Sequence, residues 1–523
     1  MDRSEHVEPG CGHVPYESNV TVQTGVEASN ILERTRTVTS EGVEVAGMSD
    51  PFVIVGGDAA GLSAASKHRR ENPDREVIVF EKGRWVSYAQ CGMPYYVKGE
   101  VDSLLDMLSL TPSEARERGI DLRREHEVVG IDTDASTVSV DGPDGQFEQP
   151  YGDLLVATGA EAVSAPIDGS HLDGAFTIHS MDSTAAVRAF LTDPAEPEFA
   201  EPDVEYVDTA LVEEFLAREP PETAAIVGGG YVGVEMAEAF AAHDLDVHLF
   251  QRPDQLLEPF GEAVGERAAE TLRENGVTLH LGEAVDRIES DGNGDVGGVR
   301  SISGSVDADV VVVGIGIRPN SGLVATTPVE LGESGAIATD RYGETNVDGV
   351  YAAGDCAEMR HAVTGSQDWV PLGLTANRAG RAVGQTVAGK PAPVGDIAGT
   401  AVVKAFDMEC GRTGLVDHER ATAAGFDPVS KTVTAGSRSG YYPGGAETTV
   451  TLTADRGSGK LLGATIAGTD RAAIRIDTLA TALENDMTVA ELERTDLAYA
   501  PPFSPVWDPV LVGAKVLNGA LED

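Results

Sequence analysis

The sequence predicts an α/β protein organised around two βαβ units. Two observations carry this prediction. Strand-like and helix-like stretches alternate along the chain, and two glycine-rich loops, within 51–82 and 223–252, each join an apolar strand to a helix of small residues. At 523 residues the chain can form roughly two to four domains and bury a large core.

The first unit begins with an apolar strand at 52–55 and a turn that contains Gly56 and Gly61. A helix that starts at such a turn can hold a pyrophosphate through its backbone N–H groups. The next strand ends in Glu81, about 20–25 residues after the turn, where a carboxylate can bind ribose hydroxyls. Asp58 replaces the middle glycine of the G-x-G-x-x-G pattern, which weakens the motif.

The second unit matches G-x-G-x-x-G fully, with Gly228, Gly230 and Gly233 between an apolar strand and a small-residue helix. Its second strand ends in Gln251 and Arg252 instead of the acid that binds an NAD ribose. A neutral amide beside an arginine can accept a 2′-phosphate, so NADPH is admissible beside NADH, and the choice between them stays open.

Three more strand-and-turn segments accompany the glycine loops, at 151–160, 311–320 and 345–358. The last ends in Gly354 and Asp355, which places a carboxylate at the C-terminal end of a strand, where a sugar-like chain can be bound. Each segment is weak evidence alone, whereas their order and spacing together are specific.

Two stretches are expected to lie outside the folded core. Residues 1–48 are polar without clear periodicity, and we predict a disordered extension there. The stretch 192–208 combines three prolines with seven acidic residues and is predicted to be an acidic surface insertion.

The chain is strongly acidic, with 86 acidic and 38 basic residues and a formal net charge of −48. This charge repels itself in dilute salt, but at molar salt the Debye length falls to about 3 Å and the repulsion is screened. We interpret the composition as adaptation to a salt-filled cytoplasm, of the halophilic type. The same charge disfavours nucleic-acid binding.

Apolar runs and cysteines indicate the compartment. The longest strongly apolar run, 310–317, is too short to span a bilayer, and the N-terminus lacks a secretory pattern, so we expect no membrane association. The cysteines and histidines show no disulfide or metal-ligand spacing, which suits a reducing cytoplasm. The cysteines are Cys11, Cys91, Cys356 and Cys410. Cys356 and Cys410 are expected to be buried thiols.

From about residue 50 to 523, these motifs together resemble the FAD-dependent pyridine nucleotide–disulfide oxidoreductases. The resemblance implies two Rossmann-like dinucleotide-binding domains, one for FAD (49–165 and 296–384) and one for NAD(P) (166–295), and an α+β dimerisation domain (385–523). The implied FAD residues are Gly56, Gly61, Glu81, Lys82, Thr158, Gly159, Gly354, Asp355, Thr375 and Ala376. The implied NAD(P) residues are Gly228, Gly230, Tyr231, Val232, Gly233, Gln251, Arg252 and Gly316.

A solitary cysteine points to one branch of the family. In "SYAQCGMPYY" (87–96), a second redox cysteine would stand at Pro94 or Tyr96, so Cys91 has no partner thiol nearby. The segment resembles the single-cysteine members, namely coenzyme A disulfide reductases, persulfide or polysulfide reductases, and NADH oxidases and peroxidases. The oxidases and peroxidases carry a histidine where this chain has Ala59, which argues against peroxide chemistry.

Two tyrosine segments favour the CoA-reducing members, "GYYPGG" (440–445) and "AYAPPFSPVWDP" (498–509). The resemblance implies that Tyr441 and Tyr499 reach the cysteine of the other subunit in a homodimer with a shared active site. It also implies coenzyme A contacts from Ser87, Gln90, Lys67 and Arg70.

The expected activity is NAD(P)H-dependent reduction of coenzyme A disulfide through a Cys91–CoA mixed disulfide. A nearby helix N-terminus and the flavin are expected to lower the pKa of Cys91. Reduction of CoA persulfide, polysulfide or sulfur stays open as an alternative, as does NADH oxidation by O₂. A non-enzymatic redox sensor would require a catalytically silent site.

Overall fold

The computed structural model describes residues 50–164, 167–193 and 206–522, which belong to one compact unit. The predicted extension at 1–48, with Cys11, and most of the predicted insertion at 192–208 lie outside the described residues. Within the described chain, no helix is long and apolar enough to cross a membrane.

The first sheet is parallel, with strand order β18-β7-β1-β2-β3. Its strands are β1 (Phe52–Val55), β2 (Val77–Glu81), β3 (Asp121–Arg124), β7 (Asp153–Val156) and β18 (Val350–Ala352). Every residue of β1, and the first four of β2, are buried, as the continuous apolar runs predict for a sheet that is covered on both faces. Because β18 joins strands from the start of the chain, this sheet is built from two distant segments.

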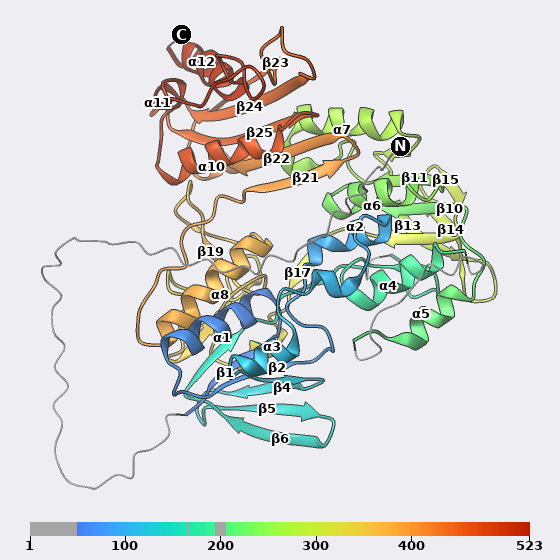
Figure 1. Cartoon of the computed structure of the whole chain (residues 1–523), viewed down its shortest axis with the longest axis vertical. Helices are drawn as coiled ribbons and strands as arrows, with labels where there is room; N and C mark the ends of the chain where they lie inside the picture. The colour runs from blue at the N-terminus through green and yellow to red at the C-terminus, as the bar shows by residue number, and fades with distance from the viewer. Residues whose placement is uncertain (1–49, 165–166, 194–205, 523) are drawn as a thin grey trace, which may run out of the picture. The chain divides into compact units, whose positions relative to one another are not determined.

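Two helices far apart in the chain pack closely together beside this sheet, α1 (Ala59–Glu71) and α8 (Gly373–Val387) (Figure 1). Glycines on α8 permit the contact. A Cβ at Gly380 would lie 2.0 Å from the Ala60 carbonyl oxygen, and one at Gly384 would lie 2.2 Å from that of Ala64. These contacts fix the second half of α8 against the first turns of α1.

The second sheet is also parallel, with strand order β12-β11-β10-β16-β9. Its strands are β9 (Ala175–Phe176), β10 (Thr223–Val227), β11 (Asp246–Gln251), β12 (Thr278–Leu281) and β16 (Val310–Val313), and its neighbouring helices are α4 (Met181–Phe190), α5 (Thr209–Leu216), α6 (Tyr231–Ala241) and α7 (Glu262–Glu274). The domain boundary expected at 295/296 falls too early, because β16 pairs with β10 in this sheet.

Within the described residues, four smaller antiparallel sheets accompany the two parallel sheets. They are β4 (Glu127–Asp132) with β5 (Thr137–Gly142) and β6 (Gly145–Pro150), β13 (Val285–Ser290) with β14 (Val296–Ser301) and β15 (Gly304–Asp307), β8 (Ala160–Ala162) with β17 (Ile317–Pro319), and β19 (Met359–Arg360) with β20 (Gln367–Asp368).

The C-terminal part is an antiparallel sheet with strand order β21-β22-β25-β24-β23. Its strands are β21 (Ala401–Ala405), β22 (Met408–Gly414), β23 (Pro428–Gly436), β24 (Glu447–Asp455) and β25 (Leu461–Gly468), and its helices are α9 (His418–Ala423), α10 (Ile476–Glu484), α11 (Val489–Glu493) and α12 (Pro509–Glu522). All of β25 is buried, with α10 packed against it, so this part has a core of its own. The α/β class and the α+β C-terminal part are confirmed.

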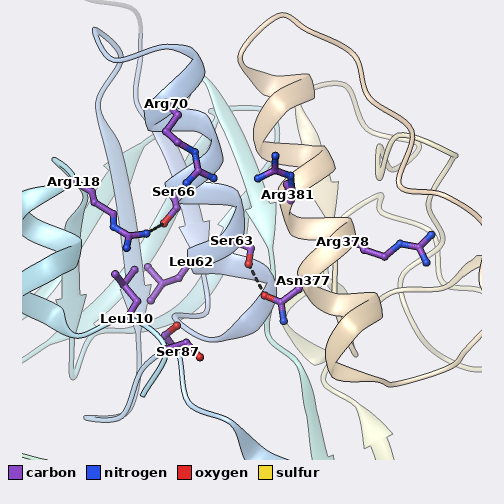
Figure 2. A pocket seen from close by; sticks show the side chains of 11 residues that line it. Leu62, Ser63, Ser66, Arg70, Ser87, Leu110, Arg118, Asn377, Arg378 and Arg381 are labelled. Atoms are coloured by element: carbon purple, nitrogen blue, oxygen red, sulfur yellow. Dashed lines mark hydrogen bonds between the residues drawn. The ribbon is translucent and has the colours of Figure 1, made fainter. Parts of the chain in front are cut away.

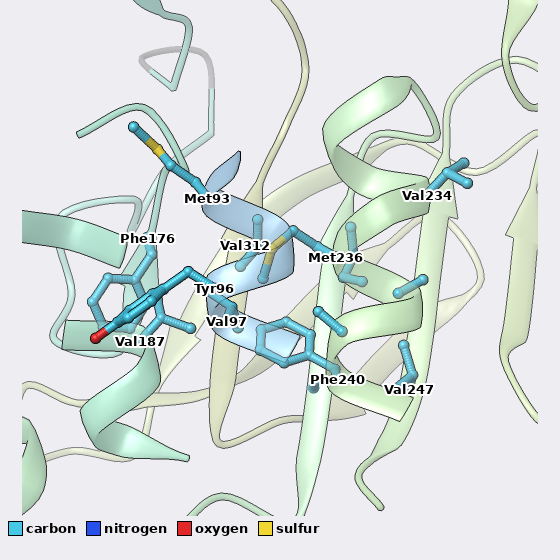
Figure 3. Packing of buried hydrophobic residues seen from close by; sticks show 14 of the residues in the cluster. Met93, Tyr96, Val97, Phe176, Val187, Val234, Met236, Phe240, Val247 and Val312 are labelled. Atoms are coloured by element: carbon cyan, nitrogen blue, oxygen red, sulfur yellow. The ribbon is translucent and has the colours of Figure 1, made fainter. Parts of the chain in front are cut away.

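Two short helices, α2 (Met93–Lys98) and α3 (Pro112–Glu117), follow β2. α2 comes directly after Cys91, and its apolar side packs against α6 and α4 (Figure 3). Tyr96 is 1% exposed and Val97 is fully buried, in one cluster with Phe240. Full burial of such a side chain stabilises the fold by about 1.5–3 kcal/mol, so α2 is anchored firmly to the second unit.

Candidate active site

Three neighbouring strands of the first sheet lead into glycines with positive φ angles. The backbone after the C-terminal ends of these strands therefore carries no side chain at three positions. The angles are +112° at Gly56 after β1, +69° at Gly159 after β7 and +84° at Gly354 after β18. A Cβ at Gly56 would lie 2.1 Å from the Ala157 carbonyl oxygen, so only glycine fits there. A Cβ at Gly61 would lie 1.9 Å from the Gly56 carbonyl oxygen.

Glu81 at the end of β2 fixes the first glycine loop. Its Oε2 accepts a hydrogen bond of 2.8 Å from the Gly57 N–H, and its Oε1 accepts one of 2.7 Å from the Gly83 N–H. Lys82, next in the chain, is exposed. The carboxylate therefore lies against the glycine loop, in the position that the ribose-binding prediction requires.

Asp355 follows Gly354 after β18, at the same edge of the first sheet. It is partly buried, and burial raises its pKa to about 6, an effect that nearby His179 opposes. Thr158 donates a 2.6 Å hydrogen bond to the Asn320 carbonyl oxygen. Thr375 and the buried Ala376 lie in the first turn of α8. An open backbone cradle, two helix N-termini and a poorly solvated carboxylate fit the pyrophosphate and polyol parts of an FAD.

The second glycine loop repeats this geometry. Gly228 has a φ of +112°, and a Cβ at Gly233 would lie 1.8 Å from the Gly228 carbonyl oxygen. Cβ atoms at Gly230 and Gly316 would meet nothing within 4 Å, so the backbone is open on that side. Tyr231 and Val232 form the first turn of α6. These residues fit a second dinucleotide.

Gln251 takes the place in the second unit that Glu81 holds in the first. Its Oε1 accepts a 2.9 Å hydrogen bond from the Gly229 N–H, and its Nε2 donates one of 3.2 Å to the Gln255 carbonyl oxygen. The Gln251 amide thus lies against the second glycine loop as the Glu81 carboxylate lies against the first, and its contact with a 2′-phosphate stays a prediction. Exposed Arg252 remains the candidate for that contact.

Cys91 lies in a short 3₁₀ turn, Gln90–Gly92, directly before α2, and it is an exposed free thiol. Although its surface is exposed, the protein packed around it raises its pKa by burial, and the carboxylates of Glu235 and Asp355 raise it further. The expected lowering of the Cys91 pKa is therefore wrong for the chain's own groups, because burial and then two carboxylates raise it. Cys356 and Cys410 are buried, as expected.

A pocket of about 330 Å³ lies beside the start of this cysteine segment, between α1 and α8 (Figure 2). Four of its lining residues are arginines and none is acidic: Arg70, Arg118, Arg378 and Arg381. Burial lowers the pKa of Arg70, and Arg381 and Arg118 lower it further. Such mutual repulsion favours binding of an anion with several charges.

Two of the four residues predicted to contact coenzyme A line this pocket, Arg70 and Ser87. Lys67 is only 8% exposed and forms an ion pair with Glu71. Gln90 is not among the lining residues and donates a 3.4 Å hydrogen bond to Asp58.

Sequence reasoning missed three arginines of the pocket, and only two of them carry a local signal. Arg378 and Arg381 stand three residues apart on α8, and this spacing is the local signal. Figure 2 shows Arg381 directed toward α1 and Arg378 directed away from it, where Arg378 donates a 3.2 Å hydrogen bond to the Asp396 carbonyl oxygen. Arg118 follows α3, and its Nη1 donates a 3.3 Å hydrogen bond to the Ser66 hydroxyl, so only the fold brings it in.

The two predicted tyrosines lie together on the C-terminal part. Tyr441 is 77% exposed and Tyr499 is 49% exposed. Their hydroxyls interact, and this contact is the main cause that raises the pKa of Tyr441. Among the described residues, no cluster of histidine, cysteine and carboxylate side chains could hold a metal ion.

Comparisons with known proteins agree with this geometry. A family model described as pyridine nucleotide-disulphide oxidoreductase matches residues 50–371, and its dimerisation-domain model matches 400–509. The chain is 39% identical over 474 residues to the NAD(P)H coenzyme A polysulfide/persulfide reductase of Pyrococcus horikoshii, which covers 90% of this chain and 99% of the relative. It is 29% identical over 470 residues to the coenzyme A disulfide reductase of Staphylococcus aureus, which covers 89% and 99%.

A solved structure, that of an NAD-dependent persulfide reductase from A. fulgidus, superposes with a TM-score of 0.82. It is 32% identical and covers 90% of this chain and 84% of that chain. With both family models matched and relatives aligned over nine-tenths of its length, the chain belongs to the pyridine nucleotide-disulphide oxidoreductases, flavoproteins that use FAD and NAD(P)H as cofactors.

Proposed function

We propose that this enzyme uses NAD(P)H to reduce the sulfur–sulfur bond of a coenzyme A derivative at Cys91. CoA persulfide or polysulfide is the first candidate substrate, because the relative at 39% identity carries that name. CoA disulfide, the substrate expected from the sequence, is the second candidate, supported by the relative at 29% identity.

The arginine pocket is the observation that carries the proposal. Coenzyme A is a polyanion attached to a thiol through a long neutral arm, so its enzyme needs a cationic pocket within reach of a reactive cysteine. In a chain of net charge −48, four arginines without an acid in one pocket are an unusual concentration of positive charge. Ser87, which also lines the pocket, stands four residues before Cys91 and connects the two places.

Cys91 performs the exchange step. Its thiolate attacks the CoA-bound sulfur, forms a Cys91–S–S–CoA bond and expels hydrosulfide from a persulfide, or CoA thiolate from a disulfide. Two electrons from NAD(P)H then cleave the mixed disulfide, which returns the Cys91 thiolate and releases CoA thiol after protonation. FAD, when bound, supplies the two-electron relay between NAD(P)H and sulfur.

The tyrosine pair supports the same site from the C-terminal part. The dimerisation-domain match supports a homodimer, in which Tyr441 and Tyr499 of one subunit would reach Cys91 of the other. Two phenolic hydroxyls can donate hydrogen bonds to a leaving thiolate. Their exposure in the single chain, 77% and 49%, is compatible with a role at a subunit interface.

Oxidation of NADH by O₂ is the alternative that the family keeps open. Ala59, in the first turn of α1, offers no side chain that could hydrogen bond to an oxidised cysteine. The proposal is tested by comparing turnover of CoA persulfide, CoA disulfide and O₂ with NADH and with NADPH. Cysteine-dependent release of CoA thiol supports it, and turnover with O₂ alone refutes it.

A further inference from the structure

Asp58 occupies the position where the first glycine loop departs from its motif. It lies at the N-terminal end of α1, in extended conformation, and its side chain makes no capping hydrogen bond to the helix. The carboxylate points instead to the segment that carries Cys91. Its Oδ1 accepts a 3.0 Å hydrogen bond from the Tyr88 N–H, and its Oδ2 accepts one of 3.4 Å from Nε2 of Gln90.

The segment that Asp58 holds is strained at its start. Ser87 has a φ of +48°, a left-handed conformation that a non-glycine residue adopts only when its surroundings impose it. The Ser87 N–H donates 3.0 Å to the Gly57 carbonyl oxygen, and the Ser87 carbonyl oxygen accepts 2.7 Å from the Ser109 N–H. Asp58 adds the next contact along the chain, at Tyr88.

We propose that Asp58 is a positioning residue of the thiol site, which fixes the turn from Ser87 to Cys91 and orients the Gln90 amide. This inference rests on the proposed role of Cys91. A glycine at position 58 would leave the Tyr88 N–H and the Gln90 amide without this acceptor. Asp58, the residue that departs from the glycine motif, therefore connects the first glycine loop to the segment that carries Cys91.

Protonation of Asp58 falls near neutral pH. Burial, together with the nearby carboxylate of Glu81, raises its pKa to about 7, while hydrogen bonds from Tyr88 and Gln90 oppose the shift. Tyr88 is the other titratable group against it, and Asp58 helps to raise the pKa of that phenol. Above about pH 7 the ionised carboxylate accepts both hydrogen bonds, whereas below it one oxygen carries a proton.

The inference is tested with Asp58→Ala, Asp58→Asn and Gln90→Ala in the FAD-loaded enzyme. Asp58→Ala removes both acceptors, so amide exchange of the 87–91 segment should accelerate by about tenfold or more, and KM for the CoA substrate should rise about five- to tenfold with a smaller change in kcat. Asp58→Asn keeps an acceptor for Tyr88 and should recover most of the exchange protection, with KM raised about two- to threefold. Gln90→Ala should raise KM without faster exchange at Tyr88.

The matched control is Asp208→Ala, which removes a capping aspartate that accepts a 3.3 Å hydrogen bond from the Leu211 N–H at the start of α5. It should leave exchange at 87–91 and KM unchanged. Unchanged exchange in both Asp58 variants would overturn the inference. If the wild-type enzyme turns over no CoA substrate, the proposed function fails, while the exchange measurement still tests the role of Asp58.

Discussion

The hydroxyl of Tyr95 donates a 3.0 Å hydrogen bond to Oε1 of Glu235, and this bond joins the helix after Cys91 to the helix of the second glycine loop. Burial raises the pKa of Glu235 to about 7, and the hydrogen bond from Tyr95 opposes the shift. Glu235 in turn raises the pKa of Cys91. The reactive thiol and the helix that begins the proposed NAD(P)H site are therefore linked through one carboxyl group.

Glu235→Gln should make Cys91 more reactive in a pH-dependent way. Above about pH 7 the variant lacks a negative charge near the thiolate, so alkylation by iodoacetamide should be roughly two- to fivefold faster than in the wild-type protein. Below about pH 6 the wild-type carboxyl is protonated, so the two rates should converge. Equal rates at pH 8 would contradict an electrostatic link between the two residues.

Glu238, one turn further along α6, should contribute strongly to stability. Its side chain is 5% exposed, lies 2.7 Å from Nζ of Lys98 and contacts Lys404, and its Oε2 accepts a 2.8 Å hydrogen bond from the Phe406 N–H. Although burial opposes ionisation, these contacts lower its pKa. Their stabilisation is present above the usual pKa of a glutamate and is lost as the pH falls through the lowered value.

Glu238→Ala leaves two lysines and the Phe406 N–H without this acceptor, so the free energy of unfolding should fall by about 2–4 kcal/mol in urea titrations at constant salt. The matched control is Glu100→Ala, which removes the other carboxylate bonded to Lys98 but is 49% exposed. That change should cost no more than about 0.5 kcal/mol. Equal losses in both variants would show that burial of Glu238 does not matter.

Arg381→Gln should weaken binding of the CoA substrate without affecting cofactor reduction. Removing this guanidinium group, which lies beside that of Arg70 (Figure 2), should raise KM about five- to twentyfold, because a charge-assisted contact to phosphate is lost. NAD(P)H-dependent ferricyanide reduction should change by less than about twofold. Arg456→Gln, an exposed arginine 3.5 Å from Asp427, is the matched control and should change neither quantity. A KM unchanged in Arg381→Gln would remove the pocket from the substrate site.

The net charge of −48 predicts a salt-dependent fold. Because screening reduces the self-repulsion of the chain, Tm should rise by roughly 10 °C or more between about 0.1 M and about 2 M KCl. A neutral osmolyte at the same osmolality should give a smaller rise. A Tm independent of KCl would contradict the interpretation of the composition as an adaptation to high salt.

The sequence allowed the two parallel sheets and their glycine loops to be predicted, because buried strands and positive-φ glycines leave local patterns. The predicted domain boundary at 295/296 falls too early, since nothing local in the sequence shows that β16 returns to pair with β10. The arginine pocket could not be predicted in full, because Arg118 meets Arg70 only through the fold. The contacts of Asp58 with the Tyr88 N–H and of Gln251 with the Gly229 N–H could not be predicted, because a motif position does not reveal which backbone N–H groups a side chain engages.

The central claim is that Cys91 exchanges with a coenzyme A sulfur, and single-residue replacement tests it most directly. NAD(P)H-dependent release of CoA thiol from CoA persulfide and CoA disulfide should be measured in the wild-type enzyme and in Cys91→Ser, with FAD content and ferricyanide reduction as controls. The account predicts that Cys91→Ser releases CoA thiol at least about a thousandfold more slowly than the wild-type enzyme, while it still binds FAD and reduces ferricyanide. Release of CoA thiol at the wild-type rate by Cys91→Ser would contradict it.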